Sequence, residues 1–253
     1  MLFVEVTAAM LLLGLLLGFV GAGGSGFIIA ILTVVFGYPI HTALGTALAA
    51  MFFSSLSGSV SHYREGNMKL KTGAIVGLAG AVGAWVSSSW SSFIPEGQLG
   101  WMTSGMLFSS GLALWFRMAY QAKHAGKESA PKQAKGMRFY SSAVAIGLIT
   151  GALSGLFGIG STPFIQLGLM LILGLSMRFA AGTTMLVIMP IALAGGAGYY
   201  SVGYLDIQLL IAVVIGTMFG SYIGAKFTKR VPAVMLKTCM VLTPMLGATI
   251  LLI

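Results

Sequence analysis

Two stretches of the chain place hydroxyl side chains among glycines. They comprise Gly23, Gly24, Ser25 and Gly26 in the first stretch, and Gly160, Ser161, Thr162 and Pro163 in the second. Hydroxyls donate hydrogen bonds, and the free N–H groups at a helix start carry about half a positive charge. A glycine break that begins a new helix therefore offers several donors to an anion without a fixed cation. Pro163 suits the first helical turn, where no N–H is needed.

Three more polar side chains are candidates for the same site. Thr46 and Thr183 each follow a glycine at the beginning of a long apolar segment, and Gln166 is the one amide in its short apolar segment. We expect all three to offer donors to a bound anion. For either threonine, a hydroxyl bonded back to its own helix is an equal alternative.

The composition indicates an all-α polytopic membrane protein. Of 253 residues, 57% are apolar and 8% are charged, and the mean hydropathy is +0.97. A soluble domain would carry about 25% charged residues. Apolar runs of roughly 20 residues, the length that crosses a bilayer, recur along the chain. The first run lacks a basic head, so we interpret it as a retained span and not as a signal peptide.

The chain has ten apolar segments, five on each side of a polar linker. They cover 2–21, 27–37, 43–61, 72–92, 99–120, 139–159, 163–175, 179–200, 205–225 and 232–253. The second and seventh are too short for a hydrocarbon layer of about 30 Å at about 1.5 Å per residue. We therefore predict about eight full spans and two half-helices, each half-helix forming part of a broken, re-entrant hairpin.

The basic residues predict the orientation. All 14 Lys and Arg residues follow an odd-numbered segment, and none follows an even-numbered segment or lies at a terminus. If successive segments run in opposite directions, all loops that follow odd-numbered segments lie on the same side of the membrane. The positive-inside rule makes that side cytoplasmic. Both termini are then outside. The net charge of +9 is explained by topology, so no nucleic-acid partner is expected.

The two halves of the chain repeat each other. The stretch 14–66 aligns without a gap with the stretch 151–203, and 16 of the 53 aligned pairs are identical. Residues paired in this alignment are called equivalent below. We therefore divide the chain into a transmembrane repeat at 1–120, a basic cytoplasmic linker at 121–138 and a second repeat at 139–253. Because each half has an odd number of segments, the second half begins on the opposite side of the membrane from the first, so the second repeat should be inverted. Inverted repeats with interrupted helices are a transporter architecture with a site at the midplane.

Other functions have less support in the sequence. Walker, His-Glu-x-x-His and paired-cysteine motifs are absent, and Cys239 is the one cysteine, so we expect no enzyme, no metal site and no cofactor. The glycines at 21–26 match a dinucleotide fingerprint in spacing but follow a hydrophobic span. The carboxylates lie near segment ends, which leaves any proton coupling open. His41 and His62 could change charge near neutrality, but a plain interfacial role is the simpler interpretation.

The doubled pattern resembles the TauE/SafE sulfite-exporter family. It consists of a Gly-x-Gly break in each half, an apolar half-helix, Gly45-Thr46 and Gly182-Thr183 at the next span, and spans ending at Gly66 and Gly203. The resemblance implies export of sulfite or a small organosulfonate such as sulfoacetate across a bacterial inner membrane. A passive small-anion channel and a permease for another small anion are the alternatives. The expected partners are a small sulfur anion and membrane lipid, with the oligomeric state left open.

Overall fold

The structure, a computed structural model, describes residues 2–20, 25–123, 136–159, 161–228 and 233–252. Every regular element in these ranges is helical. In chain order the helices are α1 (Leu2–Val20), α2 (Ser25–Ala30), the π-helix η1 (Ile31–Val35), α3 (Ile40–Arg64), α4 (Leu70–Ser91), α5 (Glu96–Lys123), α6 (Gly136–Phe157), α7 (Thr162–Leu171), α8 (Met177–Ser201), α9 (Ile207–Thr228) and α10 (Ala233–Leu251).

The two short segments expected from the sequence are short in the structure. The first comprises α2 and η1 together, and the second is α7, with 10 residues. Both end earlier than their apolar runs, because Gly37 and Gly174 adopt positive φ values of 69° and 71° that turn the chain. These two glycines are equivalent in the repeat, so both halves use the same turn.

Four helices in the described part of the chain are long and apolar enough to cross a membrane. They are Ile40–Arg64, Leu70–Ser91, Gly136–Phe157 and Phe179–Ser201. Shorter apolar stretches occur in α1, in the segment of α2 and η1, and in α7, α9 and α10. The count of eight full spans stays a prediction.

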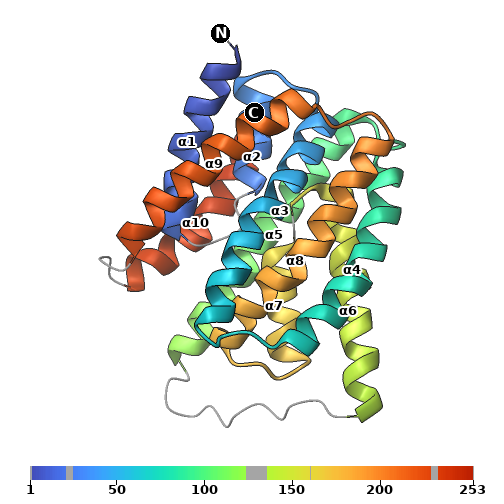
Figure 1. Cartoon of the computed structure of the whole chain (residues 1–253), viewed down its shortest axis with the longest axis vertical. Coiled ribbons are helices and arrows are strands. Elements are labelled where there is room, and N and C mark those ends of the chain that lie inside the picture. Colours follow the sequence, from blue (N-terminus) through green and yellow to red (C-terminus); the bar gives the residue numbers. More distant parts are fainter. Residues whose placement is uncertain (1, 21–24, 124–135, 160, 229–232, 253) are drawn as a thin grey trace.

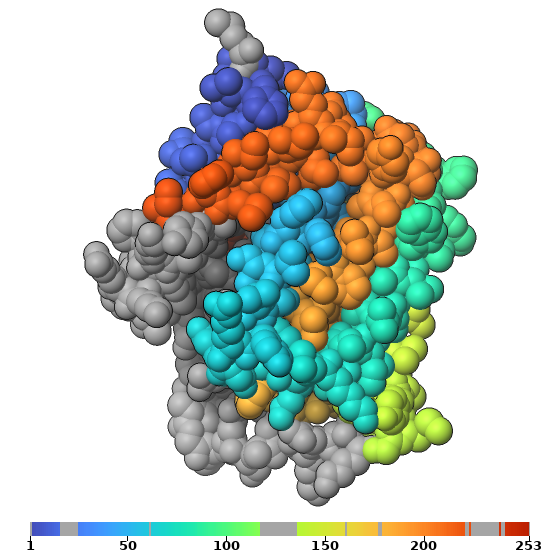
Figure 2. All heavy atoms as spheres, in the orientation of Figure 1, coloured from blue at the N-terminus to red at the C-terminus, as the bar shows by residue number. Residues whose placement is uncertain are grey.

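Helices α3 and α8 form an antiparallel pair in the middle of the bundle. Gly45 at the start of α3 faces Tyr199 near the end of α8, and Gly182 at the start of α8 faces His62 near the end of α3. Figure 2 shows this pair between α9 on one side and α4 on the other. Contacts between α3 and α8 occur in equivalent pairs: a residue of α3 that meets a residue of α8 has an equivalent in α8 that meets the corresponding residue of α3. Gly58 meets Met185, and their equivalents Gly195 and Leu48 also meet.

Two parallel pairs flank this centre, and each joins one half of the chain to the other. Helix α1 packs on α9, and α6 packs on α4. Gly14 lies against the backbone of Thr217, and the equivalent Gly151 lies against the backbone of Gly80. Small residues at these crossings let the backbones approach closely. A further pair, α5 with α10, again takes one helix from each half.

Backbone hydrogen bonds also recur at equivalent positions of the two halves. Tyr38 N donates to Leu32 O at 3.0 Å, and Leu175 N donates to Leu169 O at 3.0 Å. The turn after α3 has the bond from Asn67 N to His62 O, and the turn after α8 has the bond from Tyr204 N to Tyr199 O. These recurring bonds agree with the internal repeat that the sequence predicts.

The two ends of the bundle differ in charge. In Figure 1, α1 begins at the top and α6 begins at the bottom. The turn at 65–69 and the turn at 172–176 lie at the bottom, and Arg64, Lys69 and Lys71 are beside the first of them. The turns at 92–95 and 202–206 lie toward the top and carry no Lys or Arg. We call these the basic end and the non-basic end.

Candidate functional site

The second glycine break lies between α6 and α7. After Phe157 the chain turns at Gly158, which has a positive φ of 63° and packs against Leu44 of α3. Ser161 follows with φ 42°, and it is the one non-glycine residue with positive φ in the part of the chain described. Such conformations are costly for a residue with a Cβ and cluster at functional sites. Helix α7 then starts with a hydrogen bond from Ile165 N to Ser161 O at 3.0 Å.

The start of α7 carries two buried hydroxyls without a partner. Ser161 and Thr162 are 0% and 5% exposed, and neither hydroxyl makes a hydrogen bond within the described residues. Ser161 is the N-cap residue by position, but its side chain makes no capping bond. Pro163 is in the first turn, as expected, and has no N–H to satisfy. The donors at this helix start are therefore free for another acceptor.

The start of α2 has the same property. Ser25 is 1% exposed, and its hydroxyl has no hydrogen-bond partner within the described residues. Ser25 is equivalent to Thr162 in the repeat. The next residue, Gly26, packs against Leu107 of α5 and faces Gly247 of α10. This helix start is therefore enclosed by two other helices.

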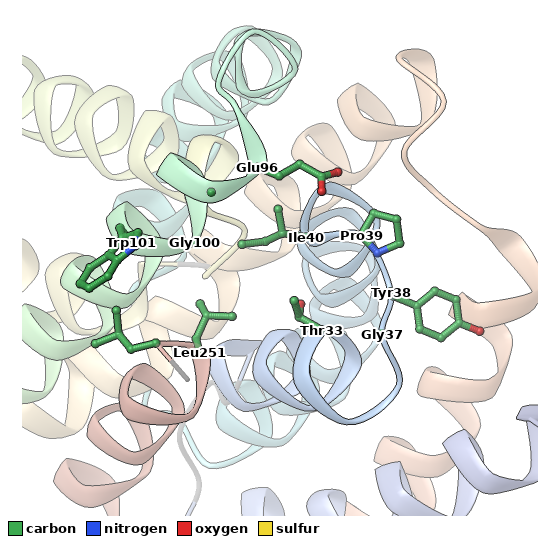
Figure 3. A pocket seen from close by; sticks show the side chains of 11 residues that line it. Thr33, Gly37, Tyr38, Pro39, Ile40, Glu96, Gly100, Trp101 and Leu251 are labelled. Carbon is green, nitrogen blue, oxygen red and sulfur yellow. The ribbon is translucent and has the colours of Figure 1, made fainter.

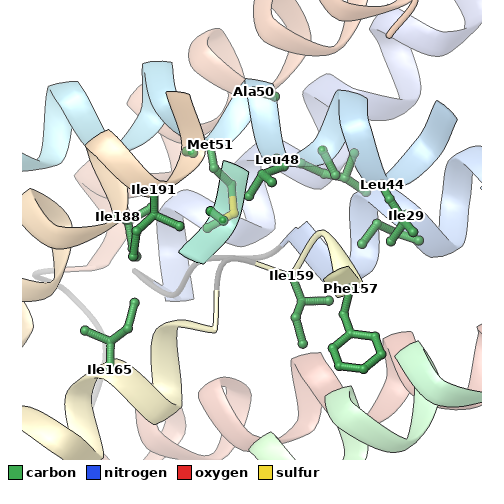
Figure 4. Close-up of a cluster of buried hydrophobic side chains, with 14 of the residues drawn as sticks. Ile29, Leu44, Leu48, Ala50, Met51, Phe157, Ile159, Ile165, Ile188 and Ile191 are labelled. Carbon is green, nitrogen blue, oxygen red and sulfur yellow. The ribbon is translucent and has the colours of Figure 1, made fainter. Parts of the chain in front are cut away.

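One buried apolar cluster connects the two short segments. Ile29 of α2, Leu44 of α3 and Ile159 of the break belong to one buried apolar cluster (Figure 4). The same cluster continues through Ile165 of α7 to Ile188 of α8. The candidate hydroxyls at the two helix starts therefore adjoin a common apolar core, where an unpaired polar group is costly.

Thr46 and Thr183 occupy equivalent positions but differ in their bonds. Both are 0% exposed. The Thr183 hydroxyl oxygen accepts a hydrogen bond from Lys69 N at 3.0 Å, which attaches α8 to the start of α4. The Thr46 hydroxyl has no partner within the described residues. Thr46 thus resembles Ser25 and Ser161, whereas Thr183 already has a structural bond.

The remaining predicted residues are one glutamine and three glycines. Gln166 is half-buried and lies about one turn beyond Thr162 in α7. Gly23, Gly24 and Gly160 lie outside the described residues, as does most of the linker at 121–138.

Three buried hydroxyls near these positions were not predicted. Thr103 and Ser104 of α5 and Ser154 of α6 are at most 1% exposed and have no hydrogen-bond partner within the described residues. Thr103 lies one helical turn before Leu107, on the helix face that packs against Gly26. Ser154 lies in the last two turns of α6, shortly before Ser161. A polar pair inside an apolar helix was the available signal for Thr103 and Ser104.

A cavity of about 500 Å³ opens at the non-basic end (Figure 3). Its walls come from η1, the start of α3, the start of α5 and the end of α10. They include Thr33, Tyr38, Ile40, Glu96, Trp101 and Leu251. Neither Ser25 nor Ser161 lines this cavity. Among the described residues, no three His, Cys, Asp or Glu side chains gather as a metal site would require.

Apolar helices interrupted at short segments are typical of many membrane transporters. The model of the family described as "Sulfite exporter TauE/SafE" matches residues 6–251. The chain therefore belongs to the TauE/SafE family and is a transmembrane transporter of that type. A family of exporters is not an enzyme class.

Several relatives carry names that agree with this family. The chain is 51% identical over 247 residues to the "Probable membrane transporter protein YdhB" of Bacillus subtilis, covering 98% of this chain and 99% of the relative. It is 26% identical to a "Probable membrane transporter protein" of Xylella fastidiosa, covering 88% and 83%. It is also 26% identical to MJ0441 of Methanocaldococcus jannaschii, another probable membrane transporter protein, covering 90% and 89%. No solved structure matches the chain.

Proposed function

We propose that this transporter exports a small sulfur oxyanion, either sulfite or a small organosulfonate such as sulfoacetate. The observation that carries the proposal is the set of buried hydroxyls at the starts of α2 and α7. Ser25, Ser161 and Thr162 are each at most 5% exposed and lack hydrogen-bond partners within the described residues. Their burial without partners costs free energy, and an oxyanion with several acceptor lone pairs removes that cost.

Among the described residues no Lys or Arg is buried, which suits a site that must release its anion. A hydrogen bond to a charged group contributes about 1.5–3 kcal/mol, so a few hydroxyls and helix N–H groups hold an anion with moderate strength. A buried Lys or Arg would bind it more tightly and slow its release. The proposed site comprises Ser25, Thr46, Ser161 and Thr162, with Gln166 of α7 as a further donor.

The proposed architecture is a pair of inverted repeats with the site at the midplane. Strict alternation of ten segments requires parallel α1 and α9, parallel α4 and α6, and antiparallel α3 and α8. The contacts described above agree with all three requirements. Rocking of one repeat against the other would then expose the site to each side in turn. We place the protein in a bacterial inner membrane, with the basic end cytoplasmic and both termini outside.

Anion binding to the purified protein tests the proposal. Calorimetric titration with sulfite, sulfoacetate, sulfate and chloride should show saturable binding of at least one sulfur anion. Ser161→Ala should weaken that binding about 10-fold or more, the equivalent of one charge-assisted hydrogen bond. Ser109→Ala is the matched control, because Ser109 is exposed on α5 and bonds back to Met106 O. Indifference to all the sulfur anions would refute the proposed substrate class.

Flux into liposomes separates a carrier from a channel. A carrier that alternates its access saturates with substrate concentration. Flux that rises in proportion to concentration, without saturation, would favour the passive small-anion channel.

A further inference from the structure

His41 lies in the first turn of α3, at the point where four segments of the non-basic end meet. It is 3% exposed although its side chain can carry charge. Ser91 from the end of α4 and Glu96 from the start of α5 approach its two ring nitrogens. Tyr204, between α8 and α9, stacks on the ring at 4.6 Å with an interplanar angle of 20°. The histidine therefore contacts both halves of the chain.

The first ring nitrogen fixes the tautomer. His41 Nε2 is 3.0 Å from Ser91 O, and a backbone carbonyl oxygen can only accept a hydrogen bond. Nε2 must therefore carry a hydrogen. In the neutral ring, the other nitrogen, Nδ1, is then a bare lone pair.

The second ring nitrogen faces a carboxylate. His41 Nδ1 is 3.6 Å from Glu96 Oε1, and Nδ1 is buried without a hydrogen-bond partner within the described residues. An ionised carboxylate also only accepts hydrogen bonds. In the neutral state, two acceptors face each other across this short distance, and one of them is buried and unpaired, which is unfavourable.

We propose that His41, together with Glu96, is a proton-binding site at the non-basic end of this transporter. A proton on Nδ1 turns two opposed acceptors into an ion pair and lets the cationic ring stack on Tyr204. The bound proton holds the Glu96 side chain of α5 against α3, and its loss releases that side chain. In the sequence alignment of the two repeats, the residue equivalent to His41 is Arg178, whose guanidinium is always charged.

The site adjoins the cavity at the same end. Glu96 and Ile40 both line the cavity, and Figure 3 shows the Glu96 side chain extending from α5 toward Pro39 at the start of α3. Release of Glu96 therefore changes one wall of the cavity. Besides Glu96, the titratable group in contact with His41 among the described residues is Tyr204, while Tyr38 precedes His41 by three residues and Asp206 follows Tyr204 by two. Burial, with the charge of Asp206 adding to it, raises the pKa of Tyr38, so this phenol stays neutral where histidine changes charge.

A spin label beside Glu96 tests the proton site without any substrate. Gly97 is suitable, because a Cβ there meets nothing within 4 Å. A nitroxide is attached to Gly97→Cys in a Cys239→Ala background, and its mobility is recorded near pH 5 and near pH 8, on either side of the usual histidine range. The label should be less mobile at the lower pH. His41→Gln and Glu96→Gln should abolish this pH dependence.

His62→Gln is the matched control, since His62 packs against Gly182 at the basic end. It should leave the pH response of the label intact. Glu96→Gln changes a side chain that is 62% exposed, so this variant should fold even if His41→Gln does not. A label whose mobility does not depend on pH, or a response that persists in Glu96→Gln, would overturn the proton site.

A coupling of this proton to anion export rests on the proposed function. It predicts that saturable anion flux depends on pH in the native protein and loses that dependence in Glu96→Gln. A pH-responsive label in a protein that binds no sulfur anion would uphold the proton site while refuting the substrate. Binding of a sulfur anion, together with a label whose mobility does not depend on pH, would support the substrate class and refute the proton site.

Discussion

Gly14 of α1 lies against Thr217 of α9, where a Cβ at position 14 would be 2.8 Å from Thr217 O. The equivalent Gly151 of α6 is even closer to the backbone of Gly80 in α4. These crossings join the two halves of the chain, so neither half buries its first helix within itself. Close backbone approach through small residues is a main source of helix association in lipid.

Gly151→Val should therefore destabilise the protein. The added side chain meets the backbone of α4 and not the end of a flexible side chain, so the helices must separate. Overpacking of this kind costs about 1–3 kcal/mol, measurable as a lower thermal midpoint in detergent. Gly105→Ala is the control, because a Cβ at Gly105 meets nothing within 4 Å and Ala favours helix. Equal midpoints for the two variants would contradict the α4–α6 crossing.

Much of the helix order was predictable from the sequence, because each apolar segment is bounded by polar or glycine-rich residues. The short α7 was predictable for a similar reason, since Gly158 and Pro163 both disfavour a continuous helix. Its starting hydroxyls were predictable from residue type alone. That Ser161 and Thr162 would be buried without partners among the described residues was not, because burial depends on how distant elements pack around the cluster that includes Ile159.

Non-local contacts could not be predicted. The pairing of α1 with α9 depends on glycines that also occur on faces without such contacts, as Gly105 shows. The bond from Lys69 N to Thr183 joins residues 114 positions apart. Likewise, the sequence alone favours a plain interfacial role for His41, because its contacts with Ser91 and Tyr204 arise only when four segments meet.

Replacements of Ser161 should separate stability from anion binding. Ser161→Gly removes the hydroxyl and also relieves the positive φ of 42°, which costs a residue with a Cβ about 1–2 kcal/mol. Ser161→Ala removes the hydroxyl and keeps the strain. We expect the Gly variant to unfold at a higher temperature than the Ala variant. Both variants should bind the anion more weakly than the native protein, by calorimetry. Native affinity in either variant would exclude the Ser161 hydroxyl from the site.

Thr46 and Thr183 should respond differently to the same replacement. Thr183→Val leaves Lys69 N without its acceptor, which should lower stability by about 1–3 kcal/mol. Thr46→Val removes a hydroxyl that has no partner within the described residues, so its stability should be unchanged or higher. Thermal unfolding measures both effects. Thr183→Ser is the control, since it keeps the acceptor oxygen. A stable Thr183→Val protein would refute the structural role of that hydroxyl, and unchanged anion affinity in Thr46→Val would remove Thr46 from the site.

Fusion reporters should show opposite sides for the two ends of the bundle. Arg64, Lys69 and Lys71 flank the turn at 65–69, whereas the turn at 92–95 has no basic residue. Because Lys and Arg are retained on the cytoplasmic side, alkaline phosphatase should be inactive when fused at 65–69 and active when fused at 92–95 or after residue 253. Green fluorescent protein at the same points should give the reverse pattern, which controls for expression.

The second half of the chain should behave in the same way. Because α3 and α8 are antiparallel and equivalent in the repeat, alkaline phosphatase should be inactive when fused at 172–176 and active when fused at 202–206. Phosphatase activity at 65–69 together with inactivity after residue 253 would show that the orientation of the whole bundle is the reverse of the proposed one. Activity at both 65–69 and 92–95 would show that α4 does not cross the membrane.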